Sequence, residues 1–453
     1  MQARVRELAE ELQVPGVAVG VFHDEQERYA VHGVTSVENP LPVDENTMFQ
    51  FGSTGKTYTS VALLRLIQDG MVDLDAPVRA YVPELKLRDP SAAENVTVLQ
   101  LLNHTAGWDG DFFEDTGDGD DALTHYVERM AELQQLTPPG FIVSYNNASL
   151  SLAGRIIEKV TGKTYERAVK ELVLDPIGLG MTMFFPNDIM SRRFVVGHRR
   201  EEDGTIRVLR PWAMARSGNA MGGLSATAPD QIRWARFHLD RGRTLDGEQL
   251  LAPELIERMQ QPTAEVPGSA LGDAIGISWL LRDVGDERVV AHGGSTNGQY
   301  SGFEMVPARR FALVSLTNAE PNGPLFNKRI SDWAFETYLD LVEADPVPEP
   351  RAADALAEYA GTYETVAVVM KVSIDGDHLL LDTEPKPELV VQLGEDADYR
   401  EPPMPLGMIA GEGDRYVVPS GPHEGSKGFF VRDAEGRISG IHAGGRYAPR
   451  VLS

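Results

Sequence analysis

The chain has 453 residues, and its 42% hydrophobic and 8% aromatic content is ample for packed cores in two or three domains, which excludes a disordered chain. The formal charge of -26 and a pI near 4.8 argue against nucleic acid or an anionic membrane as a partner, because the long-range field would repel either one. The absence of cysteine excludes disulfides, thiolate metal sites and a cysteine nucleophile.

The first segment, MQARVRELAEELQVPG, has the pattern of a charged amphipathic helix rather than that of a signal peptide. No later stretch approaches the roughly 20 apolar residues that a membrane-spanning helix requires. The expectation is therefore a cytoplasmic protein with no membrane partner, although a chain trimmed of its leader would show the same pattern.

The N-terminal part of the chain predicts a β-hairpin followed by helices. Residues 15–24 and 27–37 are β-branched, alternating runs separated by a charged turn. From Ser53 to Met71 the apolar residues recur at helical spacing, and Gly70 fits a helix end. Further helices are predicted within residues 96–107, 126–136, 147–162 and 229–242.

Strands return late in the chain. The runs predicted as successive antiparallel strands are residues 276–283, 287–294, 300–307 and 310–318, and a closing helix is predicted over residues 331–342. Strands at both ends with a long helical insertion between them are expected when one sheet is built from both ends of a domain. The fold class is therefore α/β (α+β), an antiparallel sheet flanked by helices, with a cleft where the insertion joins the sheet.

A proline-rich and acidic stretch, EADPVPEPRAAD, predicts a linker over residues 343–353. It separates a first domain, residues 1–342, from a second domain, residues 354–453. The second domain consists of short alternating runs with Asp-Gly and Glu-Gly turns, a pattern that favours a small all-β barrel.

The run DGDFFEDTGDGDD, from Asp109 to Asp121, is acidic and of low complexity. It does not fit the calcium-loop template, so it is interpreted as a solvated loop rather than a metal site. Neither a metal nor any other cofactor is predicted.

The stretch QFGSTGKTYTS poses the central question about function. It is not a phosphate-binding loop, because the position five residues before Gly55 is Gln50 rather than glycine. It is not the G-x-S-x-G turn that is typical of many serine hydrolases either, because Phe51 stands where the first glycine should be. What remains is S-x-x-K, in which Lys56 lies on the same helical face as Ser53 and its amine can take the serine proton.

This motif alone is weak, since about one or two copies occur by chance in a chain of this length, and a helix cap with a surface lysine would explain it. Two further elements lie at breaks between predicted elements: Tyr145 with Asn147 before a helix, and His292-Gly293-Gly294-Ser295 after a strand. Each has a structural explanation by itself, as a half-buried aromatic, a helix cap, a structural histidine or a turn. Together and in this order they match three motifs of one enzyme superfamily.

The chain resembles the serine β-lactamase and DD-peptidase superfamily, specifically the class C β-lactamase-like branch, which also contains esterases and D-aminopeptidases. The similarity extends from about Val14 to Leu341, and the resemblance implies a β-lactamase-like fold for this part. Further segments that are similar to family signatures are LLNHTAG at residues 101–107, PPG at 138–140, AGRIIEKVTGKTY at 153–165, DPIGLGMT at 175–182 and GGLSATAPD at 222–230.

The resemblance implies a role for each motif residue. Ser53 is the nucleophile that becomes acylated, and Lys56 with Tyr145 forms one coupled acid–base unit whose proton is not assigned to either residue. Asn147 is expected to hold Lys56 and the substrate amide. The backbone N–H groups of Ser53 and Ser295 are expected to form the oxyanion hole.

Substrate contacts are expected on both sides of the nucleophile. Gly293 and Gly294 would let the substrate backbone approach the strand edge closely. Pocket walls are expected from Trp108, Phe112, Phe113, Trp212 and the loop over residues 298–300, from their positions in the chain.

One position departs from the β-lactamase pattern. His292 stands where β-lactamases usually carry a lysine, whose fixed charge helps to hold a substrate carboxylate, whereas histidine is mostly neutral at pH 7. The H-G-G form is similar to that of peptidases, D-aminopeptidases and esterases of the branch. Several peptidase-like members also carry a C-terminal lipocalin-like barrel, and AEYAGTYE is similar to the start of one.

The function expected is that of a metal-independent serine hydrolase that cleaves amide or ester bonds of small peptides or D-amino-acid derivatives. The alternatives are a carboxylesterase or weak β-lactamase of the same family, or a catalytically idle binding or scaffold protein. The partner expected is a small-molecule or short-peptide substrate, and a homo-oligomer is left open.

Overall fold

The computed structural model describes residues 1–201, 203–344, 346–387, 402–421 and 423–451. Three predicted regions contain positions outside the described residues: the linker (345), the barrel (388–401 and 422) and its last run (452–453). No helix among the described residues is both long and apolar enough to cross a membrane.

A nine-stranded antiparallel sheet forms the centre of the first part of the chain, in the order β2-β1-β14-β13-β11-β10-β9-β8, with β12 added beside β13. Its strands are β1 (Gly16–His23), β2 (Gln26–Gly33), β8 (Ala264–Ser269), β9 (Gly272–Ile275), β10 (Leu280–Val284), β11 (Glu287–Ala291), β12 (Gly294–Thr296), β13 (Gln299–Val306) and β14 (Phe311–Thr317). Val17 in β1 lies opposite Thr317 in β14, so the two ends of this part meet in one sheet, as predicted.

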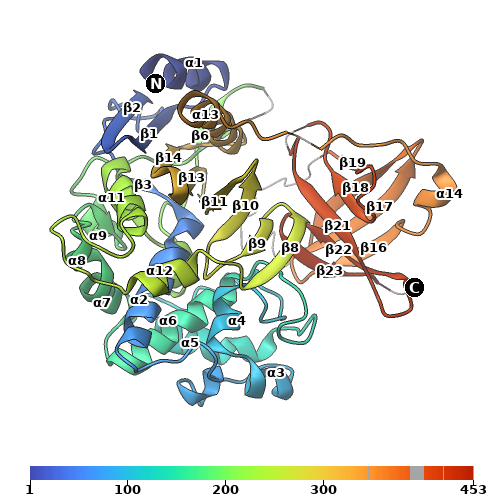
Figure 1. Ribbon diagram of the computed structural model, residues 1–453, viewed down its shortest axis with the longest axis horizontal. Coiled ribbons are helices and arrows are strands. Elements are labelled where there is room, and N and C mark those ends of the chain that lie inside the picture. The colour runs from blue at the N-terminus through green and yellow to red at the C-terminus, as the bar shows by residue number, and fades with distance from the viewer. Residues whose placement is uncertain (202, 345, 388–401, 422, 452–453) are drawn as a thin grey trace.

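Helices cover both faces of this sheet (Figure 1). On one face, α1 (Gln2–Glu11) and α13 (Asn322–Leu339) pack against Val17 and Val19, and on the other, α2 (Gly55–Gln68) and α11 (Ala228–Leu239) pack against Ala18. Successive side chains of a strand point to opposite faces, so a strand covered on both sides is apolar throughout. This explains why seven consecutive residues of β1 are buried.

The remaining elements of this part form the insertion beside the sheet and two small three-stranded sheets, β3-β7-β4 and β15-β5-β6. The helices are α3 (Pro90–Asn95), α4 (Val98–Leu102), α5 (Ala122–Arg129), α6 (Asn147–Thr161), α7 (Tyr165–Val169), α8 (Asp175–Ile177), α9 (Pro186–Ile189), α10 (Asn219–Gly222) and α12 (Pro253–Met259). The strands are β3 (Phe49–Gln50), β4 (Thr182–Met183), β5 (His198–Arg200), β6 (Ile206–Val208), β7 (Ser225–Ala226) and β15 (Ala319–Glu320).

The C-terminal part is a nearly closed antiparallel barrel of eight strands that follow one another in chain order. After α14 (Ala353–Leu356) they are β16 (Gly361–Glu364), β17 (Val368–Asp375), β18 (His378–Pro385), β19 (Met404–Met408), β20 (Arg415–Val417), β21 (Lys427–Arg432), β22 (Ile438–Ala443) and β23 (Arg446–Pro449). The barrel, orange to red in Figure 1, lies beside the β8 edge of the large sheet. The order of neighbouring hairpins confirms the predicted all-β barrel.

Several elements differ from the sequence prediction. The helix predicted within residues 126–136 is α5, which starts earlier, at Ala122, and is followed by a 3-10 turn that ends at Glu132. The last helix of the first part begins at Asn322, nine residues before the predicted start at Ser331. Its first turn contains Gly323 and Pro324, which local propensity penalises and packing on the sheet overrides. Strands β8 and β9 were missed, since Pro267 and Gly268 interrupt the pattern at a sheet edge, where proline is tolerated.

A histidine buried in the core predicts how stability depends on pH. His238 lies among Trp234, Phe237 and Trp279, and burial lowers its pKa from 6.5 to about 3. Between pH 6.5 and about 3, His238 is protonated in the unfolded chain but not in the folded chain. Its contribution to the unfolding free energy is therefore fully present above pH 6.5 and is lost as the pH falls toward 3. His238→Leu is expected to reduce the pH dependence of the unfolding free energy by up to ~1.4 kcal/mol per pH unit within this window, measured by urea denaturation from pH 7 to 5.

Candidate active site

Ser53 lies in a short 3-10 turn, Gly52–Thr54, that leads directly into α2. Two hydrogen bonds fasten this turn to the sheet: the Thr54 hydroxyl donates to the His292 carbonyl at 2.9 Å, and the Ser301 hydroxyl donates to the Phe51 carbonyl at 2.7 Å. The serine is therefore held beside β12 at the positive end of a helix dipole. It is also partly exposed, so a substrate can reach its hydroxyl.

Two glycines allow β12 to run directly against the serine turn. Gly52 has a φ of +55°, and a Cβ on it would lie 2.6 Å from the Ser295 nitrogen. A Cβ on Gly294 would lie 2.7 Å from the Ser53 nitrogen. Only glycine fits at these positions, and the backbone N–H groups of Ser53 and Ser295 consequently border the same small space. Gly294 thus serves the packing of the chain itself, while the neighbouring Gly293 is exposed at the cleft.

Lys56 is completely buried one helical turn beyond the serine. Its Nζ lies 2.9 Å from Ser53 Oγ and donates to the Met221 carbonyl at 2.7 Å. Burial lowers the pKa of Lys56 well below its ordinary value, and the nearby Arg446 acts in the same direction, while Asp111 opposes both. The lowered pKa favours the neutral amine, which is the form of lysine that can accept a proton.

The Tyr145 side chain is buried above the lysine, with the Lys56 Nζ 5.0 Å from the ring centroid. Burial raises the pKa of Tyr145, whereas its hydrogen bond with Ser53 and the positive charge of Arg446 lower it. Burial therefore moves the two pKa values in opposite directions, and both shifts favour a protonated phenol beside a neutral amine.

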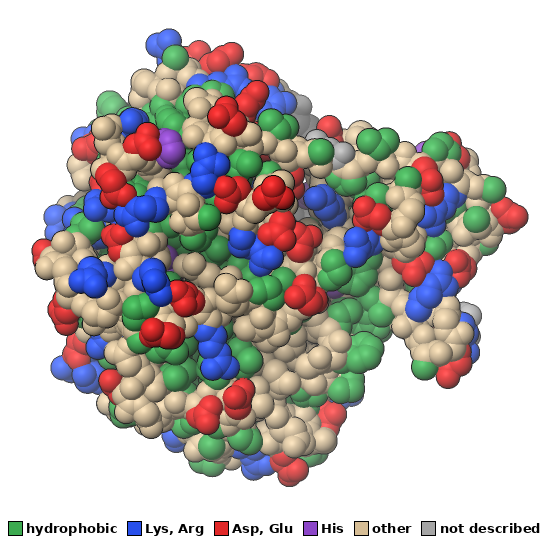
Figure 2. Space-filling model, in the orientation of Figure 1, with side chains coloured by type: hydrophobic (Ala, Val, Ile, Leu, Met, Phe, Trp, Pro, Cys, Tyr) green, Lys and Arg blue, Asp and Glu red, His purple; other side chains and the backbone are tan. Residues whose placement is uncertain are grey.

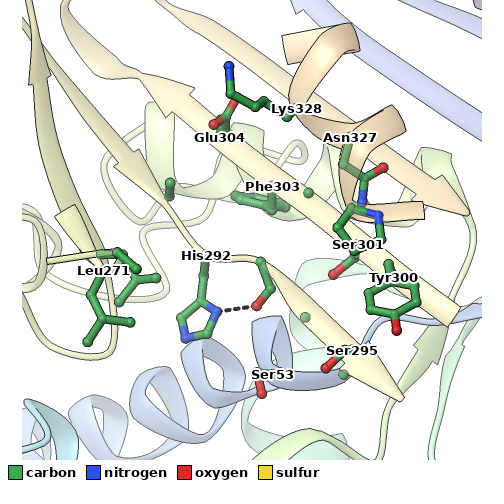
Figure 3. A pocket seen from close by; sticks show the side chains of 18 of the residues that line it. Ser53, Leu271, His292, Ser295, Tyr300, Ser301, Phe303, Glu304, Asn327 and Lys328 are labelled. Carbon is green, nitrogen blue, oxygen red and sulfur yellow. Dashed lines mark hydrogen bonds between the residues drawn. The ribbon is translucent and has the colours of Figure 1, made fainter. Parts of the chain in front are cut away.

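His292 is buried at the end of β11 and stays neutral. Burial lowers its pKa to about 3. Its Nδ1 lies 2.5 Å from the Gly293 carbonyl, shown as a dashed line in Figure 3, and a carbonyl can only accept a hydrogen bond. The proton is consequently on Nδ1, and Nε2 presents a lone pair.

Two residues that sequence analysis did not assign to the site complete it. Arg446, at the start of β23 in the barrel, places its guanidinium carbon 5.1 Å from the Tyr145 ring centroid and pairs with Asp111, with Nη2 3.0 Å from Oδ1. Burial lowers the pKa of the Arg446 guanidinium, but the effect of Asp111 is larger and raises this pKa above its ordinary value. The Asn147 amide also donates to Asp111, at 2.9 Å, whereas the hydrogen bonds of Lys56 go to Ser53 and Met221 rather than to Asn147, which was expected to hold it.

The interpretation of the acidic run as a solvated loop is therefore wrong for its first residues. Asp109 is 4% exposed and accepts a hydrogen bond from the Val366 nitrogen of the barrel at 2.6 Å. Asp111 joins the two parts of the chain through Arg446, 335 residues later in the sequence. The residues from 117 to 121 are exposed, as predicted.

The β22–β23 hairpin also holds the segment around Tyr145 through the backbone. The Tyr145 nitrogen donates to the Gly445 carbonyl at 2.9 Å, and the Tyr447 nitrogen donates to Ser144 Oγ at 3.1 Å. His442 Nε2 lies 3.0 Å from the Val143 carbonyl. The position of the tyrosine thus depends on a contact from the second part of the chain.

One cleft of about 680 Å³ is bordered by Ser53, Tyr145, Asn147, His292 and Arg446. Figure 3 shows Ser53 at the start of its helix, facing His292 and Ser295, with Asn327 and Lys328 of α13 on the far wall. From the sequence-predicted residues the cleft brings together Ser53, Tyr145, Asn147, His292, Gly293, Gly294 and Ser295, with Phe113 and Tyr300 as walls.

Three predicted wall residues, Trp108, Phe112 and Trp212, do not line this cleft, and of the loop over residues 298–300 only Tyr300 does. Phe112 packs against the hydrophobic core. Trp108 is completely buried in the hydrophobic core, because its indole packs inside the helical insertion rather than toward solvent. Trp212 is half-buried, and its Nε1 donates to the Val195 carbonyl at 2.8 Å. Met214 and Met221 line the cleft on that side.

Acidic and basic side chains are interspersed over the face in Figure 2, and apolar side chains gather where the barrel meets the first part of the chain. Among the residues that the structure describes, no group of His, Asp and Glu side chains is arranged to hold a metal ion.

The Beta-lactamase family model matches residues 1–335. Penicillin-binding protein 4 of Amycolatopsis lactamdurans is 32% identical over 369 residues, which cover 80% of this chain and 96% of that protein. A β-lactamase of Yersinia enterocolitica is 31% identical over 250 residues, covering 55% of this chain and 61% of that protein. The crystal structure of SurE, also solved with D-Leu, superposes with a TM-score of 0.79 at 27% identity and covers 99% of this chain and 98% of SurE.

The chain therefore belongs to the Beta-lactamase family, and it is a serine hydrolase of that family. The expected β-lactamase-like fold is confirmed, and the similarity to SurE extends through the C-terminal barrel.

Proposed function

We propose that the protein acylates Ser53 and hydrolyses an amide or ester bond of a small peptide or a D-amino-acid derivative, without a metal. The observation that carries this proposal is the Lys56 Nζ, buried and 2.9 Å from Ser53 Oγ at the edge of a cleft. A neutral amine at this distance is the activation that a serine hydroxyl needs to become a nucleophile.

The reaction follows from the protonation states of the site. Lys56 accepts the proton of Ser53 as Oγ attacks the carbonyl carbon, and the resulting oxyanion accepts hydrogen bonds from the Ser53 and Ser295 nitrogens. Tyr145 gives its proton to the leaving amine or alkoxide and regains one through the lysine. Water then attacks the acyl group by the same route in reverse and releases the acid.

The histidine supports a peptidase-like substrate over a β-lactam. A neutral His292 cannot supply the fixed charge of the lysine that it replaces, and the charge of Arg446 is paired with Asp111. The structure of SurE with D-Leu supports a D-amino-acid derivative. An esterase or a weak β-lactamase would use the same acyl-enzyme and differ in the leaving group, and an idle scaffold would be the choice if Ser53 proved unreactive.

The partner that we propose is a small molecule or short peptide, with the enzyme acting in the cytoplasm. Assembly into a homo-oligomer is a separate proposal, which light scattering coupled to size exclusion would test. A single species at the 49.6 kDa of one chain would contradict it.

The test of the proposed function is the intact mass of the protein after incubation with a fluorophosphonate and, separately, with a penicillin. We expect one adduct per chain with the fluorophosphonate, located on Ser53, because Lys56 activates this serine. A stable penicilloyl adduct would favour a peptidase-like site, and rapid release of hydrolysed penicillin a β-lactamase. No adduct with either reagent would contradict the acyl-enzyme.

A further inference from the structure

His104 is a buried histidine that the reaction outlined above does not use. It follows α4, is completely buried and has a φ of +61°, in the left-handed region that few side chains adopt. Such a conformation persists only where the surroundings determine it, and it often marks a functional position.

This one residue holds the backbone on both sides of Tyr145. Its carbonyl accepts a hydrogen bond from the Ser144 nitrogen at 2.8 Å. Its Nδ1 accepts one from the Asn146 nitrogen at 3.1 Å. Because Nδ1 is an acceptor, the imidazole is neutral and carries its proton on Nε2.

The imidazole ring also supports the phenol directly. The ring centroids of His104 and Tyr145 are 4.4 Å apart with an angle of 32° between the planes, and the Lys56 Nζ lies 5.0 Å from the same phenol ring. Burial lowers the pKa of His104 well below its ordinary value, and the positive charge of Arg446 acts in the same direction. Burial and this charge keep the ring neutral, and neutrality preserves the bond to Asn146.

We propose that His104 is a positioning residue that fixes Tyr145 against Lys56 and Ser53, through its ring and through hydrogen bonds to the residues before and after the tyrosine. This inference rests on the proposed function. Its consequence is that His104 governs the rate of proton transfer at Ser53 rather than the affinity for a ligand.

Two variants separate the two contacts. His104→Asn keeps an acceptor near the Nδ1 position and suits the left-handed backbone, but it removes the ring from Tyr145. His104→Phe keeps a ring and removes the acceptor for the Asn146 nitrogen. In both we expect the first-order rate constant for fluorophosphonate labelling of Ser53 to fall by about tenfold or more, with the half-saturating reagent concentration changed by less than about threefold.

The pH dependence of labelling gives a readout that a purely structural role would not move. Loss of the ring in His104→Asn admits water beside Lys56, which raises the pKa of the amine toward its ordinary value. The acidic limb of the labelling profile is therefore expected to shift to higher pH by about half a unit or more. In His104→Phe a ring still fills the space beside Tyr145, so the acidic limb of the labelling profile is expected to stay at the wild-type pH.

His238→Asn is the matched control, because His238 is also buried, in α11 among tryptophans, and neither of its nitrogens has a partner among the described residues. The inference would be overturned if His104→Asn and His238→Asn lost the same labelling rate at the same loss of thermal stability, and if the acidic limb of the profile did not shift. If wild-type protein is not labelled at all, the proposed function fails instead, so the two failures are distinguishable.

Discussion

Replacing Ser53 with alanine is expected to reduce turnover by on the order of 10³-fold or more and to abolish the fluorophosphonate adduct. The change removes the only atom that the proposed reaction acylates, and Lys56 then has no proton to accept. Turnover is measured with a chromogenic ester, and the adduct is measured by intact mass.

The same variant is expected to keep the fold, with a change in unfolding free energy of less than about 1 kcal/mol. A helix cap was the alternative explanation of this serine, but the Ser53 side chain caps neither the 3-10 turn nor α2. What alanine removes is the contact with Lys56, whose Nζ keeps its bond to the Met221 carbonyl. Wild-type turnover in folded Ser53→Ala would show that another group is the nucleophile.

The motifs could be located from the sequence because each lies in a short segment whose chemistry is local. Ser53 and Lys56 are neighbours on one helix, and His292 follows a strand with a clear alternating pattern. The pairing of β1 with β14 was also predictable, since strands at the two ends of a domain have few other partners.

The rest of the site depends on contacts between segments that carry no local signal. Arg446 belongs to a short barrel strand, and Asp111 is one aspartate within an acidic run, so neither pattern indicates that they pair. His104 lay within a recognised signature, but its ring contact with Tyr145 appears only once both segments are folded. Composition predicted exposure for the acidic run, and the tertiary contacts at Asp109 and Asp111 overrode it.

The contacts of Arg446 and Gly445 lead us to propose that the barrel completes the active site, and Arg446→Ala tests this in the full-length chain. Without the guanidinium, Asp111 loses its ion pair and Tyr145 loses a positive charge that lowers its pKa. We expect labelling of Ser53 to slow by about 100-fold, because a small displacement of a catalytic group costs this much. Arg437→Ala is the matched control, since Arg437 is 74% exposed and its ion pairs with described residues are all within its own turn.

Deleting residues 352–453 tests the same dependence together with the predicted linker. If residues 343–353 are a linker, the remaining chain is expected to fold, because the cores on both faces of the large sheet lie within it. It is nevertheless expected to label at least as slowly as Arg446→Ala, since the Tyr145 nitrogen also loses its bond to the Gly445 carbonyl. Circular dichroism and the labelling rate are the two measurements.

The outcomes of the deletion separate the claims. An insoluble or molten product would count against the linker, and a folded product with the full labelling rate would show that the barrel does not act on the site. Loss of the barrel also uncovers Val143, Val266 and Ile275, which pack against Phe429, so a lower unfolding temperature is expected in either case. If the truncated chain is folded but labels slowly, while Arg437→Ala labels at the wild-type rate, the second part of the chain positions Tyr145 for the proposed reaction.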